Sequence, residues 1–201
     1  MQSTREHLYV VVLAAGEASR FGSAKQLAGW QNGNMVQHAV AVARELVSNR
    51  VFVVLGAHAE AVQKTLNQNP VHIVHNPDWQ QGLSTSIRAG IEALPEDTEA
   101  VLLLLCDQPL LDATSLEQLI TGWQQQAESI VASEYDHSIG VPAIFPKNYF
   151  AQLAALKGDR GAKQILMAMR DQVLTLSIPE AAMDIDTPEE LELLKTQNQN
   201  R

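Results

Sequence analysis

Residues 8–26 read LYVVVLAAGEASRFGSAKQ, an apolar run that passes directly into a loop of small and basic residues. The apolar part is β-branched and unbroken, which is typical of a strand buried on both faces of a parallel sheet. In such a sheet, ligands usually bind beyond the end of a strand. Gly16 and Gly22 permit positive φ angles and close backbone approach, and Arg20 and Lys25 add two cations. The stretch therefore predicts a polyphosphate-binding loop.

The same loop has a simpler interpretation. Every strand is followed by a turn, and small residues with exposed basic side chains often form one. The loop also lacks the Gly-Lys-Ser/Thr ending of a P-loop, and the spacing of Gly16 and Gly22 differs from the dinucleotide fingerprint. The two glycines alone therefore do not identify a nucleotide site.

Length and composition define a class of protein. The chain has 201 residues, 46% of them hydrophobic, which is enough for a sizeable core in a single domain over residues 1–201. The formal net charge of −9 argues against a nucleic-acid or membrane-surface binder, because those interfaces need clustered Lys and Arg. Without an apolar run of about 18 residues or a signal peptide, the chain is expected to be cytoplasmic. Its single cysteine, Cys106, excludes an internal disulfide and is expected to be a small buried residue.

Apolar strands alternate with amphipathic helices along the chain. Strands are expected over residues 8–13, 51–55, 71–75, 100–106, 129–133, 139–145 and 173–177. Helices are expected over residues 35–47, 60–66, 83–94, 116–127, 149–156, 164–169 and 191–195. This alternation predicts an α/β fold, with a mostly parallel central sheet flanked by helices as a three-layer sandwich. Pro142 predicts an edge or bulged strand, and the polar tail 196–201 is expected to be disordered.

Carboxylates stand at two places that a ligand site would use. Asp107 follows the most apolar strand, and Asp184 and Asp186 precede the last helix. The carboxyl end of a strand is where an open α/β sheet places ligand chemistry, and carboxylate oxygens suit Mg²⁺ carried on phosphates. An acid here can instead cap the next helix, but Asp112 or Thr114 is better placed for that. Because alternate residues of an extended segment point the same way, Asp184 or Asp186 can share a metal with Asp107.

Two further segments have both a functional and a purely structural interpretation. The helix that begins near Leu83 places Ser84, Thr85 and Ser86 in its first turn, where hydroxyl and N–H groups suit a base or a phosphate but also serve as ordinary caps. The charged loop 158–163 is either a surface turn or a substrate contact. Together with two carboxylates and a basic glycine loop, these segments suggest attack by a phosphate oxygen on an activated α-phosphate, without a nucleophilic side chain.

Five blocks of the sequence, in order, resemble the molybdenum cofactor cytidylyltransferases, a group of MobA-like NTP transferases. The blocks lie at residues 13–26, 76–90, 107–109, 158–162 and 184–188. The resemblance implies a Rossmann-like nucleotidyltransferase fold. It also implies transfer of CMP from CTP to a molybdopterin-type cofactor, with Mg²⁺ as the metal and pyrophosphate as the second product. A recipient molybdoenzyme is then an expected partner, and nucleic acid and membrane are not.

The resemblance also implies residue roles, which are carried over position by position. The residues expected to line the nucleotide are Leu13, Ala15, Gly16, Gly82 and Ser84; those expected to bind the triphosphate are Arg20 and Lys25; the expected Mg²⁺ ligands are Asp107 and Asp186; and those facing the acceptor are Gly140, Pro142 and Asp159. Lys25, Arg20 and Asp107 are the candidate catalytic residues.

Three positions depart from the family pattern. Val141 stands where the family usually has a histidine between Gly140 and Pro142, Cys106 replaces a common glycine, and Lys163 replaces a frequent arginine. Loss of the histidine puts the acceptor in doubt. The alternatives are transfer of a guanylyl or other nucleotidyl group to a different small phosphorylated acceptor, or a non-catalytic role as a cofactor carrier.

Overall fold

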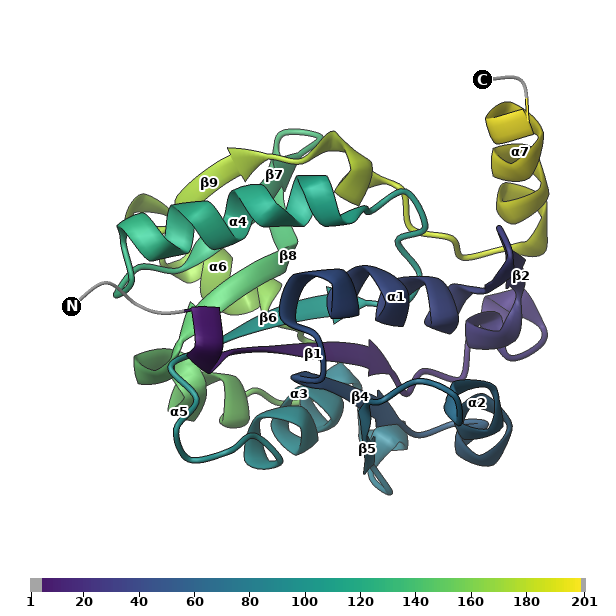
Figure 1. The fold of residues 1–201 in the computed structure, drawn as a ribbon, viewed down its shortest axis with the longest axis horizontal. Coiled ribbons are helices and arrows are strands. Elements are labelled where there is room, and N and C mark those ends of the chain that lie inside the picture. Colours follow the sequence, from purple (N-terminus) through teal and green to yellow (C-terminus); the bar gives the residue numbers. More distant parts are fainter. Residues whose placement is uncertain (1–4, 200–201) are drawn as a thin grey trace.

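The core of the protein is a seven-stranded sheet with strand order β5-β4-β1-β6-β8-β7-β9, seen in the computed structural model in Figure 1. The structure describes residues 5–199. The strands of this sheet are β1 (Leu8–Ala14), β4 (Val51–Leu55), β5 (His72–His75), β6 (Ala100–Leu105), β7 (Val131–Tyr135), β8 (Ser138–Pro146) and β9 (Leu174–Ser177). All neighbouring strands pair in parallel except β8, which is antiparallel to both β6 and β7. The predicted α/β class and mostly parallel sheet are confirmed.

Helices cover both faces of the sheet and make three layers. The helices are α1 (Met35–Val47), α2 (Ala59–Leu66), α3 (Leu83–Glu92), α4 (Ala113–Gln125), α5 (Phe150–Ala154), α6 (Lys163–Ala168) and α7 (Pro188–Gln199). Apolar residues of α1, α2 and α4 pack into the core on one face, and those of α3, α5 and α6 pack into the core on the other. Figure 1 shows the sheet between α1 and α4 on one side and α3 and α5 on the other.

Strand β1 lies at the centre of this arrangement. Its side chains alternate between the two faces: Val10 and Val12 join one core, while Val11 and Leu13 join the other. The three valines have no exposed surface. An unbroken apolar run is therefore what this position requires, and β1 delivers the loop that follows it to the carboxyl edge of the parallel strands.

Pro142 predicts an edge strand or a bulged one, and strand β8 is the bulged one. It lies inside the sheet between β6 and β7. The expected bulge is present, because the pairing with β7 shifts from Ala132 opposite Ala143 to Ser133 opposite Gly140 and leaves Val141 and Pro142 out of register. Proline has no N–H to donate, and at the bulge none is needed. We call residues 140–142 the β8 bulge.

A small third cluster ties the C-terminal helix to the N-terminal loop. Its buried members are Phe21, Trp30, Met35, Ile185, Leu191 and Leu194. Trp30 belongs to a two-stranded hairpin formed by β2 (Gly29–Trp30) and β3 (Gly33–Asn34). The cluster therefore brings the segment before α7 against the loop after β1, although more than 150 residues separate them in the sequence.

Helix α7 begins as the sequence indicates and continues further. Pro188 is its first residue, and Thr187 and Glu190 form the predicted capping box. The Thr187 amide donates to Glu190 Oε2 at 2.9 Å, and the Glu190 amide donates to Thr187 Oγ1 at 3.3 Å. The helix runs to Gln199, so the disorder predicted from residue 196 is wrong over 196–199; the last two residues lie outside the described part of the chain.

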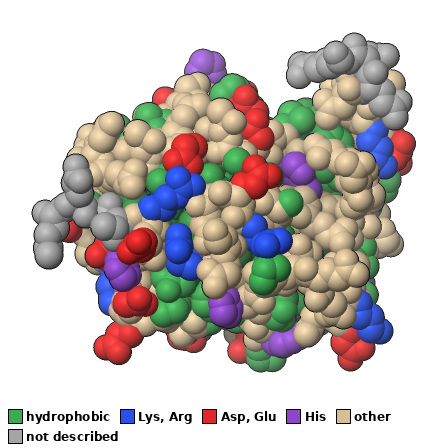
Figure 2. Space-filling view, viewed as in Figure 1, with side chains coloured by type: hydrophobic (Ala, Val, Ile, Leu, Met, Phe, Trp, Pro, Cys, Tyr) green, Lys and Arg blue, Asp and Glu red, His purple; other side chains and the backbone are tan. Residues whose placement is uncertain are grey.

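The surface carries mixed charge. On the face drawn in Figure 2, acidic and basic side chains are interspersed among polar and backbone atoms. Over residues 5–199, no helix is both long enough and apolar enough to pass through a bilayer.

Candidate active site

A cavity of about 540 Å³ opens at the carboxyl ends of β1 and β6. This is the edge at which an open α/β sheet places its ligands. Of the residues singled out from the sequence, those that line the cavity are Leu13, Ala15, Gly16, Lys25, Gly82, Asp107 and Asp159. The structure therefore gathers parts of four of the five matched blocks around one space.

The loop after β1 is held in shape from within by Gln26. This side chain is 3% exposed, and its Nε2 donates to the carbonyl oxygens of Ala14 at 3.0 Å and Gly16 at 2.6 Å. Gly22 takes the positive φ of 73° that the sequence suggested, but the other left-handed residue of the loop is Ala18 at 56°, not Gly16. A Cβ on Gly16 would meet no atom within 4 Å, so at this position glycine leaves open space beside the cavity.

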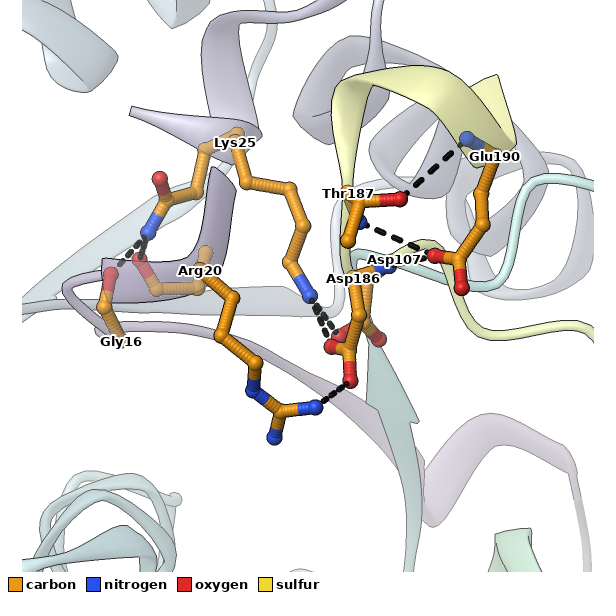
Figure 3. A network of polar contacts seen from close by, with 9 residues as sticks. Gly16, Arg20, Lys25, Asp107, Asp186, Thr187 and Glu190 are labelled. Atoms are coloured by element: carbon orange, nitrogen blue, oxygen red, sulfur yellow. Dashed lines mark hydrogen bonds and ion pairs between the residues drawn. The ribbon is translucent and has the colours of Figure 1, made fainter. Parts of the chain in front are cut away.

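Four charged side chains from three distant segments meet beside this loop, and we call them the charged cluster: Arg20, Lys25, Asp107 and Asp186. Lys25 Nζ lies 2.7 Å from Asp107 Oδ2 and 3.3 Å from Asp186 Oδ1, and Arg20 Nη1 lies 2.6 Å from Asp186 Oδ2. Figure 3 shows the ammonium group pointing at the two carboxylates. The meeting of Asp107 and Asp186 is as the sequence indicated; their role as metal ligands stays a prediction.

The cluster combines a buried centre with an exposed rim. The Lys25 side chain is 12% exposed and that of Asp107 20%, whereas the Arg20 side chain is 77% exposed. Burial by itself lowers the pKa of Lys25, but the charge and the hydrogen bond of Asp107 outweigh it, so that the pKa is raised above its ordinary value. Lys25 is therefore a firmly charged cation at neutral pH.

Two neighbours of the cluster titrate differently from ordinary residues. Burial, followed by the nearby Asp107 charge, raises the pKa of the Cys106 thiol to about 12, so this residue is a buried thiol as the sequence indicated. The carboxyl of Asp184 keeps contact with solvent, yet the protein packed around it and the charge of Asp107 raise its pKa to about 6. A hydrogen bond with the Gln108 side chain and the charge of Lys25 lower the pKa of Asp184, but they offset this rise only in part.

The cluster offers the donors that a hard divalent cation requires. Asp107 Oδ1 is buried and has no hydrogen-bond partner among the described residues, and Asp186 supplies a second carboxylate. Capping does not account for Asp107, since Asp112 caps α4 by accepting from the Ser115 amide at 2.7 Å. Over residues 5–199 no group of three or more His, Cys, Asp or Glu side chains forms a metal centre. Two carboxylates fit Mg²⁺, which usually completes its shell with water and substrate phosphates.

The opposite wall of the cavity is formed where α3 begins. Gly82 has a φ of 106°, and a Cβ there would lie 2.4 Å from the Gly158 carbonyl carbon, so glycine is required for the loop 158–161 to dock. The Ser84 amide donates to the Gly158 carbonyl oxygen at 3.1 Å. Docking of this loop also places Asp159 at the cavity beside the β1 loop.

The serines of α3 are placed differently from the sequence-based assignment. Ser84 is 1% exposed, and its hydroxyl has no partner in the described chain, but it is not among the cavity-lining residues. Ser86 lines the cavity, and its hydroxyl accepts from Asn76 Nδ2 at 3.0 Å. The nucleotide contact predicted for Ser84 thus stays a prediction. Two further residues line the cavity: Ser86, a first-turn candidate that was not assigned to the nucleotide, and Gln26, which was not a candidate. Both lie within the matched blocks, which is the signal that could have found them.

The residues of the β8 bulge are not among those that line the cavity, so the acceptor contacts predicted for Gly140 and Pro142 stay predictions. Buried Gln108, next to Asp107, donates through Nε2 to the carbonyl oxygens of Val141 at 3.3 Å and Ala181 at 2.9 Å. The Tyr135 hydroxyl also donates to the Val141 carbonyl oxygen, at 3.1 Å. Hydrogen bonds to backbone therefore connect the bulge that carries Gly140 and Pro142 to the strand end that carries Asp107.

A mostly parallel α/β sheet with a basic loop and paired carboxylates at its carboxyl edge is the architecture of a nucleotide-handling enzyme. The chain belongs to the family of the MobA-like NTP transferase domain, whose model matches residues 10–173. Membership in this nucleotidyltransferase family supports a transferase activity for this protein.

Three similar proteins can be compared with the chain. It is 26% identical to the molybdenum cofactor cytidylyltransferase of Escherichia coli K12, over 90% of this chain and 91% of that protein. It is 29% identical to the nicotine blue oxidoreductase of Paenarthrobacter nicotinovorans, over 90% and 93%. The crystal structure of Rv0371c from Mycobacterium tuberculosis H37Rv in complex with manganese superposes with a TM-score of 0.76 at 26% identity, covering 95% of this chain and 98% of that chain.

Proposed function

We propose that this protein transfers CMP from CTP to a molybdopterin-type cofactor and releases pyrophosphate, with Mg²⁺ as the metal. The observation that carries the proposal is the charged cluster at the cavity: a buried lysine and an exposed arginine meet two carboxylates from distant segments. A relative of nearly the same length is a molybdenum cofactor cytidylyltransferase, which supports this donor and acceptor.

The cluster suits an in-line displacement at the α-phosphate. A phosphate oxygen of the acceptor forms a bond to the α-phosphorus, and the bond from that phosphorus to the bridging oxygen breaks, so that pyrophosphate leaves with its electron pair. Lys25 and Arg20 hold the β- and γ-phosphates and neutralise the charge that grows on the leaving group. No side-chain nucleophile is required, and Cys106 cannot serve as one because its thiol is buried and protonated at neutral pH.

Asp107 and Asp186 would hold the metal. When bound, Mg²⁺ supplies a Lewis acid that neutralises and orients the phosphates. A manganese complex of a structural relative supports a divalent cation in this family. The protein's own contribution is to keep the two carboxylates together, through Lys25 and through the buried cluster that anchors Ile185.

A different acceptor is the second candidate. Val141 replaces the histidine that the family usually carries, and in the structure it lies in the β8 bulge, where its carbonyl oxygen is bonded to Gln108 and Tyr135. The side chain adds no polar contact. A relative of similar length, 29% identical to this chain, is a nicotine blue oxidoreductase, which supports a substrate other than molybdopterin as the second candidate.

The test is pyrophosphate release measured with CTP, GTP, ATP or UTP, with Mg²⁺, and with or without molybdopterin cofactor. We expect release only with CTP and cofactor together. Release with CTP and another phosphorylated acceptor would favour the second candidate. Tight cofactor binding with no release from any triphosphate would overturn the enzyme assignment in favour of a carrier.

A further inference from the structure

Lys25 occupies the place between the two carboxylates that a metal would bridge. Its ammonium contacts Asp107 and Asp186 at 2.7 and 3.3 Å, and its side chain is 12% exposed. In Figure 3 the group reaches both carboxylates from the loop after β1, and the exposed Arg20 also contacts Asp186. The same lysine is the residue that the proposed reaction needs on the triphosphate.

These two positions exclude one another. A divalent cation bound by Asp107 and Asp186 would lie within a few ångströms of the ammonium, where like charges repel strongly because the centre of the cluster is largely buried. Lys25 therefore has to move before the metal binds. A largely buried cation gives up two carboxylate partners only when another anion replaces them.

We propose that Lys25 is an exchangeable placeholder for the metal. In the ligand-free protein the Lys25 ammonium holds Asp107 and Asp186 together. When a triphosphate binds, the ammonium moves to the phosphates, and the two carboxylates become free to bind the divalent cation. Metal and triphosphate then bind cooperatively, and by linkage each raises the affinity for the other. The inference rests on the proposed function in one respect, since the triphosphate is the anion that takes Lys25.

The experiment measures metal affinity without nucleotide. Mn²⁺ is titrated into the protein, and free Mn²⁺ is followed by electron paramagnetic resonance for wild type, Lys25→Met and Lys25→Arg. We expect Lys25→Met to bind Mn²⁺ at least tenfold more tightly than wild type, because the competing cation is gone, and Lys25→Arg to stay weak. Lys64→Met, at an exposed position on α2, changes the net charge equally and is expected to match wild type.

The double variant Lys25→Met with Asp107→Asn locates the effect. We expect it to lose the gain in Mn²⁺ affinity, because one of the two carboxylates no longer carries charge. Persistence of the gain would place the metal elsewhere and overturn the proposal. An affinity of Lys25→Met equal to or weaker than wild type would also overturn it, since Lys25 would then only support the carboxylates.

Two controls distinguish the placeholder role of Lys25 from a folding defect and from failure of the proposed function. Cooperative melting verifies each variant, and Lys25→Gln, whose neutral amide can still hydrogen-bond to a carboxylate, replaces Lys25→Met if the latter does not fold. Because no nucleotide or acceptor is present, tighter Mn²⁺ binding by the neutral variants supports the placeholder even if no pyrophosphate release is found. Unchanged Mn²⁺ binding beside normal pyrophosphate release would overturn the placeholder alone.

Discussion

The charged cluster, which includes Asp107, and the β8 bulge, which is bonded to the neighbouring Gln108, are held by different forces. The cluster is built from ion pairs between side chains of three distant segments. The bulge is held by hydrogen bonds from Gln108 and Tyr135 to a backbone carbonyl, which do not depend on the side chain of Val141. The protein has therefore fixed the chemistry of the cluster through charge and left the bulge open to change in residue type.

Asp107 gives the largest test of this difference. Asp107→Asn removes the charge of this largely buried carboxylate, which we expect to lower turnover by about a hundredfold to a thousandfold, the size of effect seen when electrostatic stabilisation is lost. Pyrophosphate release is the measurement, and a cooperative melt shows that the fold remains. Asp171→Asn, at an exposed position, is the matched control and is expected to keep full activity. Full turnover by Asp107→Asn would remove this residue from the mechanism.

Gln26 tests whether the cluster depends on the loop that carries Lys25. Gln26→Leu removes the donors to two carbonyl oxygens, and we expect a loss of about 1–3 kcal/mol in the free energy of unfolding together with a raised KM for the nucleotide. Gln26→Glu keeps the shape of the side chain but places an acceptor oxygen against those carbonyl oxygens. Its loss in the free energy of unfolding is therefore expected to be at least as large as that of Gln26→Leu. Chemical denaturation and nucleotide titrations are the measurements. A Glu variant equal to wild type would show that shape alone holds the loop.

A substitution at Val141 tests the β8 bulge and leaves the charged cluster unaltered. Val141→His adds one polar group, and a single hydrogen bond is worth about 0.5–1.5 kcal/mol, so we expect about a 2- to 10-fold rise in kcat/KM for the molybdopterin cofactor. The KM for CTP should stay unchanged. Val141→Ala, which adds no polar group, is the comparison variant. A gain in both variants, or a changed KM for CTP, would contradict the separation between the cluster and the bulge.

Replacing Asp184 is expected to have the smallest effect of the four changes, and it acts on the stability of the fold. The pKa of Asp184 is raised to about 6, so the folded protein binds this proton more tightly than the unfolded chain and loses stability as the pH rises from about 4 to about 6. We expect Asp184→Asn to raise Tm by a few degrees at pH 7, with no difference near pH 4. Thermal melts between pH 4 and 8 give the measurement. A difference in Tm between Asp184→Asn and wild type that does not change with pH would refute the raised pKa of Asp184.

The elements and their order could be predicted because each strand and helix carries its own periodicity. The unbroken apolar run of β1 indicated a strand buried on both faces, and the capping box at Thr187 indicated where α7 begins. What the sequence left open or mispredicted falls where long-range packing decides. Pro142 does not reveal that its strand has neighbours on both sides, and the polar end of α7 has no local signal that the helix continues past Lys195.

The candidate site divides in the same way. The residue types of the loop, Asp107 and the pair Asp184 and Asp186 were visible in the chain, as was their fitness for phosphate and metal. Local sequence could not choose between the two aspartates, because alternation only places them on one side of the chain. The packing of Ile185 with Phe21 and Leu191 turns Asp186 toward Lys25 and Arg20.

The sequence by itself determined the α/β class, the family and the chemical character of the site, because these depend on periodicity and on residue types at short spacing. Only the tertiary structure decided which groups touch: the ammonium of Lys25 between two carboxylates, Gln26 beneath the loop, and Ser86 in place of Ser84 at the cavity. The reason is physical. The contacts of Lys25 join residues 82 and 161 positions apart, and how the sheet and the buried clusters pack sets them, so no local pattern contains that information.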